Sequence, residues 1–395
     1  MVVANYMKGD LINDEVIVFD SGHFPDPIGG GDTFIVEIVR RLPHFGWDPV
    51  FVTTSEGALA HANLGYSGRT LLWKATAFRG TSPELFGITR LVEALLRIPG
   101  SVVSRPRQVL VAASDYLYDS LPAVIFGSLR REAVLLVLHM IVPFPTSGQV
   151  QKPHLPHVTE LMEWISNRLT ILLGKVTGAR FVVVHPQIRS RLESMFKIQD
   201  KMISVVSNGV SLISDGNTHT CVSDALYVGR FHPQKCLDDL LVAWRQVITE
   251  VPSAVLSIAG PGTSRLLPRV RELGLESSVH VFDAVSEPLK KELFLGTKVF
   301  LLPSHFESFP ISLLEALSYG VPAIAYDLPC LTGPFDSGVI KVKRFDVPEY
   351  ASQVVRLLKS DTLRRAMSAE ALCSASNLTW DHSAPTFADA LRGIR

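Results

Sequence analysis

The sequence predicts an α/β protein with two Rossmann-like, doubly wound parallel-sheet domains. Short apolar, β-branched segments alternate with amphipathic helical segments along the chain, which is the pattern of parallel sheets covered by helices. The chain has 395 residues, of which 47% are hydrophobic, enough for two packed cores. Lys+Arg and Asp+Glu both number 38, and this balance argues against a bulk nucleic-acid binder.

Eleven apolar runs indicate buried strands. They lie at 16–19, 49–54, 108–113, 133–140, 181–184, 203–208, 225–229, 254–260, 279–282, 299–304 and 322–327. The segments between them, such as TFIVEIVRRLPHFG and CLDDLLVAWRQVITE, repeat apolar residues at helical spacing. We expect domains at residues 1–200 and 201–377, with 378–395 forming a terminal helix that packs back on the first domain.

The cysteines and the apolar runs predict a cytoplasmic protein. Four cysteines, at 221, 236, 330 and 373, fit neither a metal motif nor a disulfide framework, so reduced thiols are expected. The N-terminus has acids where a signal peptide is basic. The apolar run at 133–151 contains a histidine and two prolines and is too broken to span a bilayer.

Three loops that follow predicted strands carry polar signals, at the sheet edge where ligands bind in open parallel sheets. In the first, Gly29, Gly30 and Gly31 directly precede a helical segment. Consecutive glycines let backbone N–H groups approach an anion at a helix N-terminus. A tight turn is an equally good explanation of this loop by itself.

The second loop, VGRFHPQK, holds Arg230 and Lys235 after a strand. These two cations could converge on a diphosphate, although an isolated pair of surface cations is the simpler interpretation. The third, FESFPISLLEALSYG, holds Glu307 and Glu315. We expect Ser308 to cap a helix with Pro310 in its first turn. A glutamate on that helix could accept hydrogen bonds from ribose hydroxyls or could be an exposed helix residue.

Together these motifs resemble family 4 glycosyltransferases of the GT-B fold, a resemblance strongest from about residue 205 to 327. The matching stretches are SNGV, VGRFHPQK, IAGPG, VHVFDAV and LLPSHFESFPISLLEALSYGVPAIAYD, the last being the Glu-x7-Glu signature. The resemblance implies a retaining, metal-independent hexosyltransferase that takes a UDP- or GDP-sugar as substrate and uses no cofactor. The implied acceptor is a hydroxyl of a glycan, a lipid-linked molecule or a small molecule, bound by the first domain.

The resemblance also implies residue roles. Arg230 and Lys235 would hold the diphosphate, Glu315 the ribose, and Glu307 and His139 the donor sugar. His139 follows a strand, so a core histidine is the alternative. The implied catalytic set is Glu307, His139, Arg230 and Lys235, with no metal ligands. The implied donor-binding set adds Gly29, Gly30, Gly31, Phe282, Ala284, Phe309, Pro310, Ile311, Ser312 and Glu315.

The sequence departs from the family at three positions. Cys236 and Ala284 stand where glycine is preferred, and Pro310 replaces a frequent glycine and removes an N–H donor. None of these changes removes a charged side chain. A non-catalytic sugar-nucleotide-binding subunit and a sugar-nucleotide epimerase or hydrolase on the same fold remain the alternatives.

The first half also holds a basic stretch. Nine Lys and Arg residues stand against four acids from residue 69 to 131, with apolar residues between them. Such a surface could contact an anionic membrane from the cytoplasmic side and reach a lipid-linked acceptor. Solvated helix faces are the alternative.

Overall fold

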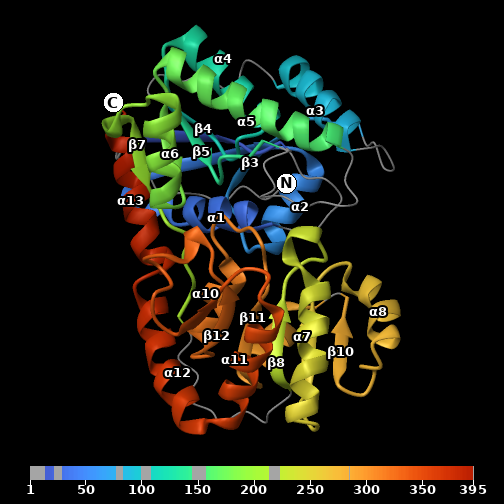
Figure 1. The fold of residues 1–395 in the computed structure, drawn as a ribbon. Coiled ribbons are helices and arrows are strands. Elements are labelled where there is room, and N and C mark those ends of the chain that lie inside the picture. The colour runs from blue at the N-terminus through green and yellow to red at the C-terminus, as the bar shows by residue number, and fades with distance from the viewer. Residues whose placement is uncertain are drawn as a thin grey trace.

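The computed structural model describes residues 14–21, 29–76, 83–98, 108–144, 157–212, 223–283 and 285–394. Within them lie two parallel sheets with helices on both sides, stacked one above the other in Figure 1. The first sheet has seven strands in the order β3-β2-β1-β4-β5-β6-β7, and the second has six in the order β10-β9-β8-β11-β12-β13. The predicted two-domain α/β architecture is confirmed.

The first sheet forms because its central strands are apolar on both faces. Ile17 in the middle of β1 aligns with Val50 on one side and Leu110 on the other, and all three side chains are buried. The strands are β1 (Asp14–Phe19), β2 (Trp47–Thr53), β3 (Arg69–Leu72), β4 (Gln108–Ala112), β5 (Ala133–Leu138), β6 (Arg180–Val183) and β7 (Ile203–Val205).

The helices of the first domain form two layers. Helices α3, α4 and α5 contact one another and form the top of the molecule in Figure 1, while α1 lies at the bottom of this domain, towards the second sheet. The helices are α1 (Gly30–Val39), α2 (Ser55–Asn63), α3 (Pro83–Arg97), α4 (Leu117–Arg130), α5 (His157–Thr177) and α6 (Pro186–Phe196).

The second sheet separates two cores. On one face Tyr227, Leu301 and Ile324 pack with α7 and α11, and on the other the alternate residues of the same strands, such as Leu226 and Phe300, pack with α9 and α10. The strands are β8 (Ser223–Val228), β9 (Leu256–Ala259), β10 (Val279–Phe282), β11 (Thr297–Leu302), β12 (Ala323–Tyr326) and β13 (Val339–Val342). The helices are α7 (Leu237–Glu250), α8 (Leu267–Glu272), α9 (Glu287–Leu295), α10 (Ile311–Ser318), α11 (Val347–Lys359) and α12 (Asp361–Ser376).

The structure differs from the sequence prediction at the sheet edges. The edge strands β3 and β13 were not predicted, because β3 is largely exposed and β13 carries a lysine, so neither has the apolar run of a buried strand. The predicted boundary at residue 200 lies before β7, whereas β7 pairs with β6 and belongs to the first sheet. The described residues 206–212 therefore follow the last strand of the first sheet and precede β8 of the second.

The chain crosses between the domains twice, and the two crossings bind each other. The Val210 N–H donates to the Leu378 carbonyl over 3.0 Å, and the Ser383 hydroxyl donates to the Ser207 carbonyl over 2.8 Å. A β-carbon on Gly209 would lie 2.3 Å from the backbone nitrogen of Trp380, so a side chain there would collide with backbone. The last helix, α13 (Trp380–Arg392), then packs against α1 of the first domain.

Candidate functional site

The loops after β8 and β11 meet at the edge of the second sheet that faces the first domain. The Gln234 carbonyl accepts from the His305 N–H over 2.9 Å, which ties one loop to the other. Lys235 Nζ then lies 2.5 Å from Glu307 Oε1, and these side chains are only 15% and 7% exposed. The structure thus brings two of the predicted catalytic residues together as a buried, charge-assisted pair.

A second lysine–glutamate pair joins α9 to α10. Lys290 of α9 contacts Glu315 of α10 over 2.9 Å and Glu287 over 3.0 Å. Burial raises the pKa of the Glu315 carboxyl, and the charge of Lys290 opposes this rise. Burial lowers the pKa of Lys290, but the two glutamates outweigh it, so the pKa is raised overall. Sequence reasoning missed Lys290, because LKKE on a helix is the pattern of an ordinary exposed helix face.

The N-terminus of α10 points its free N–H groups at this edge. The helix begins at Ile311 with Pro310 as its N-cap and has no side-chain cap, so the prediction that Ser308 caps it is wrong. The first backbone bonds of the helix run from the N–H groups of Leu313 and Leu314 to the Pro310 carbonyl. The N–H groups of Ile311 and Ser312 come before these bonds and are the ones a phosphate could use.

Arg230 is exposed at the end of β8. Among the described residues it makes no ion pair with a carboxylate, although Lys235 and Lys290 both do. The charge of Arg230 also acts on the Tyr116 hydroxyl of the first domain. Burial and the charges of Glu163 and Asp115 raise the pKa of Tyr116, and the Arg230 guanidinium acts against that rise. Arg230 is therefore a cation that remains available to an anionic ligand between the two domains.

The glycine loop forms the facing wall. A β-carbon on Gly30 would lie 3.2 Å from Ile311 Cδ1, so α1 of one domain touches α10 of the other. A β-carbon on Gly31 would lie 3.2 Å from His139 Nε2. The glycines are thus needed for close packing. The predicted anion contact is reduced at Gly29, whose N–H already donates to Asp32 Oδ2 over 2.7 Å.

His139 is held by the backbone of a neighbouring strand. Its Nε2 lies 3.1 Å from the Ala113 carbonyl, which makes Nε2 the donor and leaves Nδ1 as an acceptor. Its ring meets the Phe34 ring edge-on at 5.6 Å. The half-buried ring therefore has the backbone contact of a core histidine, while its Nδ1 has no partner among the described residues.

Asp115, which the sequence analysis did not select, lies beside His139. Burial raises its pKa, and the hydrogen bond from the Asn167 amide opposes this rise. Asn167 Nδ2 donates to Asp115 Oδ2 over 2.6 Å and also to the Met140 carbonyl over 3.0 Å. The signal in the sequence was a run of polar residues, SDY, directly after an apolar strand.

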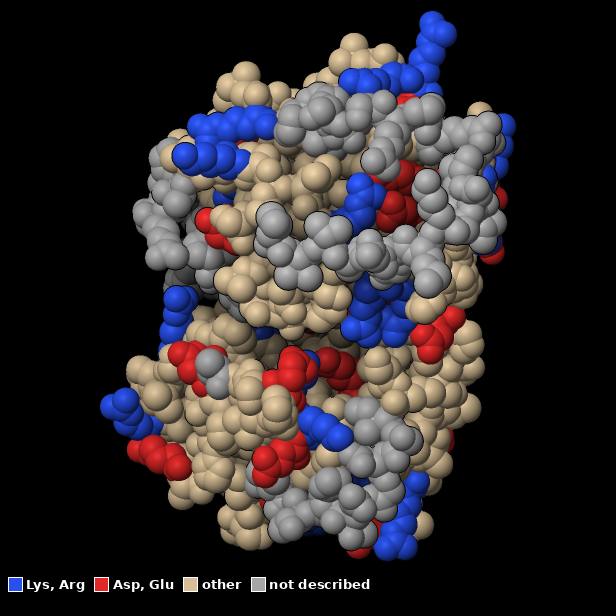
Figure 2. Space-filling view, turned by 180° about the vertical axis from the view of Figure 1, so that it is seen from behind, with Lys and Arg blue, Asp and Glu red and all other residues tan. Residues whose placement is uncertain are grey.

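A cavity of about 90 Å³ opens between the domains next to Glu307, and Figure 2 shows the surface hollowed between the upper and lower halves. Arg191 and Arg344 line it from opposite sides. His185 also lines it, and burial lowers the pKa of this imidazole. The remaining lining residues are Met140, Ile141, Gln187, Ile188, His305, Phe306, Ser308, Leu328, Pro329 and Cys330.

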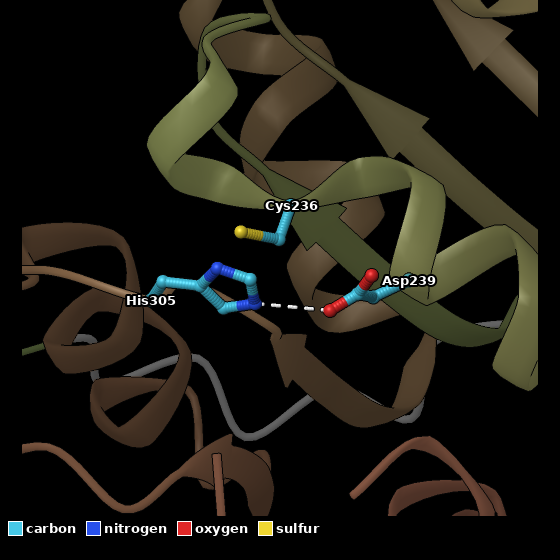
Figure 3. Close-up of side chains that lie close together, drawn as sticks. All are labelled: Cys236, Asp239 and His305. Atoms are coloured by element: carbon cyan, nitrogen blue, oxygen red, sulfur yellow. Dashed lines mark hydrogen bonds and ion pairs between the residues drawn. The ribbon is translucent and has the colours of Figure 1, made fainter. Parts of the chain in front are cut away.

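Cys236, Asp239 and His305 form a cluster of metal-ligand types behind this site (Figure 3), with ligand atoms within 4.8 Å of one another. Hydrogen bonds already engage the cluster. His305 Nε2 lies 2.9 Å from Asp239 Oδ2, which also accepts from the Tyr326 hydroxyl over 3.3 Å. Burial and the charge of Asp239 raise the pKa of the Cys236 thiol to about 12, so the thiol stays protonated at neutral pH.

The backbone explains why Cys236 is an unusual choice. Its φ is +50°, in the left-handed region, and it precedes α7. Glycine reaches this region without strain, whereas a residue with a β-carbon does so at some cost. The departure from the family at this position therefore carries backbone strain, without moving Lys235 away from Glu307.

Three predicted donor-binding residues remain. Phe309 is 6% exposed and its ring centroid lies 5.3 Å from that of Phe335, so the ring belongs to the core and is not available to a ligand. The Phe282 carbonyl at the end of β10 accepts from the Gly260 N–H over 2.9 Å. Ala284 lies outside the described residues.

Known proteins resemble this chain in sequence over part of its length and in fold over nearly all of it. Residues 222–372, which cover β8 to α12, match the family model described as glycosyl transferases group 1. The D-inositol 3-phosphate glycosyltransferase of Rhodococcus erythropolis is 28% identical over 177 residues, which is 42% of this chain and 40% of that protein. The match thus spans well under half the length of this curated relative.

Solved structures match almost the whole chain. Sucrose-phosphate synthase from Thermosynechococcus elongatus has a TM-score of 0.71 at 15% identity, over 96% of this chain and 98% of that one. Anabaena HepE in complex with UDP and glucose has a TM-score of 0.71 at 14% identity, over 96% and 100%. At such identity the likeness concerns the fold, and the predicted GT-B fold is confirmed.

Proposed function

We propose that this protein is a glycosyltransferase that moves a hexose from a nucleoside-diphosphate sugar, UDP- or GDP-linked, to a hydroxyl of an acceptor. The observation that carries the proposal is the pairing of Lys235 with Glu307 at the inter-domain edge of the second sheet. Arg230 and the uncapped N-terminus of α10 lie at the same edge. A buried arrangement of this kind suits a ligand that brings both negative charge and hydroxyl groups.

The donor would bind the second domain through its three parts. Glu315, already paired with Lys290, would accept hydrogen bonds from the ribose hydroxyls. Arg230, Lys235 and the N–H groups of Ile311 and Ser312 would bind the diphosphate. When the diphosphate draws Lys235 away, Glu307 would keep its charge by accepting from a sugar hydroxyl.

The chemical step is the cleavage of the anomeric C–O bond. Negative charge develops on the leaving diphosphate, and Arg230, Lys235 and the α10 N-terminus would stabilise it, which supports a reaction without a metal or other cofactor. The acceptor hydroxyl would attack from the face that the diphosphate leaves, and the departing phosphate oxygen would take its proton. This course retains the anomeric configuration.

The first domain would hold the acceptor. Gly31 and His139 lie across from α10, and Asp115 lies beside His139. His139 Nδ1 would accept from a hydroxyl of the donor sugar, because Nε2 is committed to the Ala113 carbonyl. The implied acceptors are glycans, lipid-linked glycans or small hydroxylated molecules.

The test is the fate of the donor with and without acceptor. The purified protein would be incubated with UDP- and GDP-sugars and an acceptor panel, with EDTA in a parallel series, and the products analysed by NMR. We expect acceptor-dependent release of nucleoside diphosphate, insensitivity to EDTA and a retained anomeric configuration. Binding without release would favour a non-catalytic subunit, and sugar release or isomerisation without acceptor would favour a hydrolase or epimerase.

A further inference from the structure

Helix α5 exposes its apolar side to solvent. Six of its exposed residues are apolar and follow one another at intervals of three or four: Val158, Leu161, Ile165, Leu169, Leu172 and Val176. That stripe is about 27 Å long at the rise of an α-helix. The side that packs against the domain is partly polar, because Glu160, Asn167 and Thr170 are buried. The polarity of this helix is the reverse of that of an ordinary surface helix.

The neighbouring helices continue the same surface. Leu85, Ile88, Val92, Leu95 and Leu96 are exposed on α3, and Ile125 and Leu129 are exposed on α4. The three helices contact one another and together form the end of the first domain that is farthest from the second (Figure 1). We call these residues, with the α5 stripe, the outer apolar face. Contiguous apolar patches of this kind mark interaction surfaces.

The fully exposed charges on these helices have one sign, whereas the half-buried Glu163 of α5 is acidic. Among the residues of α3, α4 and α5 whose exposure is described, the exposed charged ones are Arg97, Arg130 and Lys175, and Arg131 follows α4 directly. The acids Glu93, Asp119 and Glu160 are buried. Figure 2 shows blue Lys and Arg side chains at the upper end of the molecule, which these helices form.

We propose that the outer apolar face docks on the surface of a lipid bilayer that contains anionic lipids. The apolar stripes would enter the acyl boundary, and the surrounding cations would contact lipid phosphates. A second copy of the chain fits less well, because a two-fold interface would place two copies of this cationic surface face to face. The cations concerned are Arg97, Arg130 and Lys175. No helix in the described part of the chain is long and apolar enough to cross a membrane, so the helices would lie along the bilayer.

Helix α5 also contacts the candidate site, through Asn167. Asn167 projects from α5 on the side opposite the apolar stripe and binds Asp115 and the Met140 carbonyl next to His139. One helix, about 10 Å across, thus separates the proposed bilayer surface from the facing wall of the cleft. If the proposed function holds, this geometry favours a lipid-linked acceptor over a soluble one.

Co-sedimentation with vesicles, in the absence of donor, tests the proposal. The full chain would be mixed with vesicles of phosphatidylcholine alone or with equal parts of phosphatidylglycerol. We expect binding to the anionic vesicles and much weaker binding to the neutral ones. The variant Leu161→Gln/Ile165→Gln/Leu169→Gln should lose binding by a factor of ten or more, and each of Arg130→Gln and Lys175→Gln should weaken it about fivefold.

Matched controls lie on α12 of the second domain. Leu372 and Arg365 are exposed there, and Leu372→Gln and Arg365→Gln should leave vesicle binding unchanged. Unchanged melting temperatures would show that each variant folds. Failure of the wild type to bind anionic vesicles, or retained binding by the triple variant, would overturn the proposal. So would a dimer in sedimentation velocity that the triple variant abolishes, which would assign the face to a second copy. Donor binding without vesicles reports on the proposed function separately.

Discussion

Two regions depart from the usual composition of a protein surface in opposite directions. One is the edge of the second domain that faces the first, which we call the inner edge. The other is the end of the first domain that carries the outer apolar face, which we call the outer end. The inner edge buries charge, since Glu307 is 7% exposed and Lys235 15%. The outer end exposes apolar side chains, with Leu96 at 78% and Val176 at 77%. Both arrangements cost stability in the free protein unless another molecule compensates. Under the two proposals, that molecule is a polar, anionic ligand at the first region and a bilayer with anionic headgroups at the second.

Among variants of the inner edge, Lys235→Met should have the largest effect on activity. It removes a cation that acts on the leaving diphosphate, so we expect kcat/KM for transfer to fall by about a hundredfold or more. The change also leaves Glu307 buried without its partner, which should cost about 3 kcal/mol of unfolding free energy. Steady-state kinetics and chemical denaturation measure the two effects.

The double variant Lys235→Met/Glu307→Gln separates these effects. It removes both charges of the pair, so stability should return towards that of the wild type while activity stays low. Activity restored together with stability would show that Lys235 only supports the fold, contrary to the proposed role.

Glu315→Gln tests the ribose contact. Loss of a charged acceptor should weaken donor binding about tenfold to a hundredfold, measured by calorimetry with the nucleoside diphosphate alone. Glu276→Gln, an exposed acid outside the cleft, is the matched control and should bind normally. Equal affinity in both variants would remove Glu315 from the donor site.

Gly31→Ala tests the facing wall of the cleft. The added β-carbon would sit 3.2 Å from His139 Nε2, so the imidazole must shift. We expect kcat to fall about tenfold, with the affinity for the nucleoside diphosphate alone unchanged, because that ligand lacks the sugar that His139 would contact. Gly87→Ala on α3 meets no atom within 4 Å and should leave the kinetics with a soluble acceptor unaltered. Weaker binding of the nucleoside diphosphate by Gly31→Ala would place the glycine loop against the diphosphate instead of the sugar.

The smallest expected effect is a pH dependence of stability at Glu315. Its pKa is raised in the folded protein, chiefly by burial, so the stabilising contribution of its protonated form is present below the ordinary glutamate pKa of 4.5. That contribution is lost as pH rises through the folded pKa. Relative to the wild type, Glu315→Gln should therefore gain stability between acid and neutral pH. A pH-independent difference in melting temperature would contradict this.

The sequence predicted the inner edge better than the outer end, for a physical reason. Arg230, Lys235, Glu307 and Glu315 are charged residues in short local motifs, and the strand ends bring them together. The pairing of Lys290 with Glu315 depends on how α9 packs beside α10, which no local pattern encodes.

The sequence did not predict the outer apolar face, for a similar reason. An apolar stripe on α5 predicts a buried face, and only the fold shows that this stripe points to solvent. The predicted basic stretch at 69–131 covered α3 and α4 but not α5, and Arg90 within it is buried. Helix α10 also begins later than predicted, because Pro310, and not Ser308, occupies the N-cap.

The central claim is that the inner edge of the second domain binds a nucleoside-diphosphate sugar, and thermal unfolding with UDP-, GDP- and ADP-sugars tests it most directly. At about a hundred times its dissociation constant, the correct donor should add about 2.7 kcal/mol to the unfolding free energy of the wild type. The same concentration should add much less to Glu315→Gln. An absence of stabilisation by every donor in a folded sample, or an equal shift in both proteins, would contradict the account.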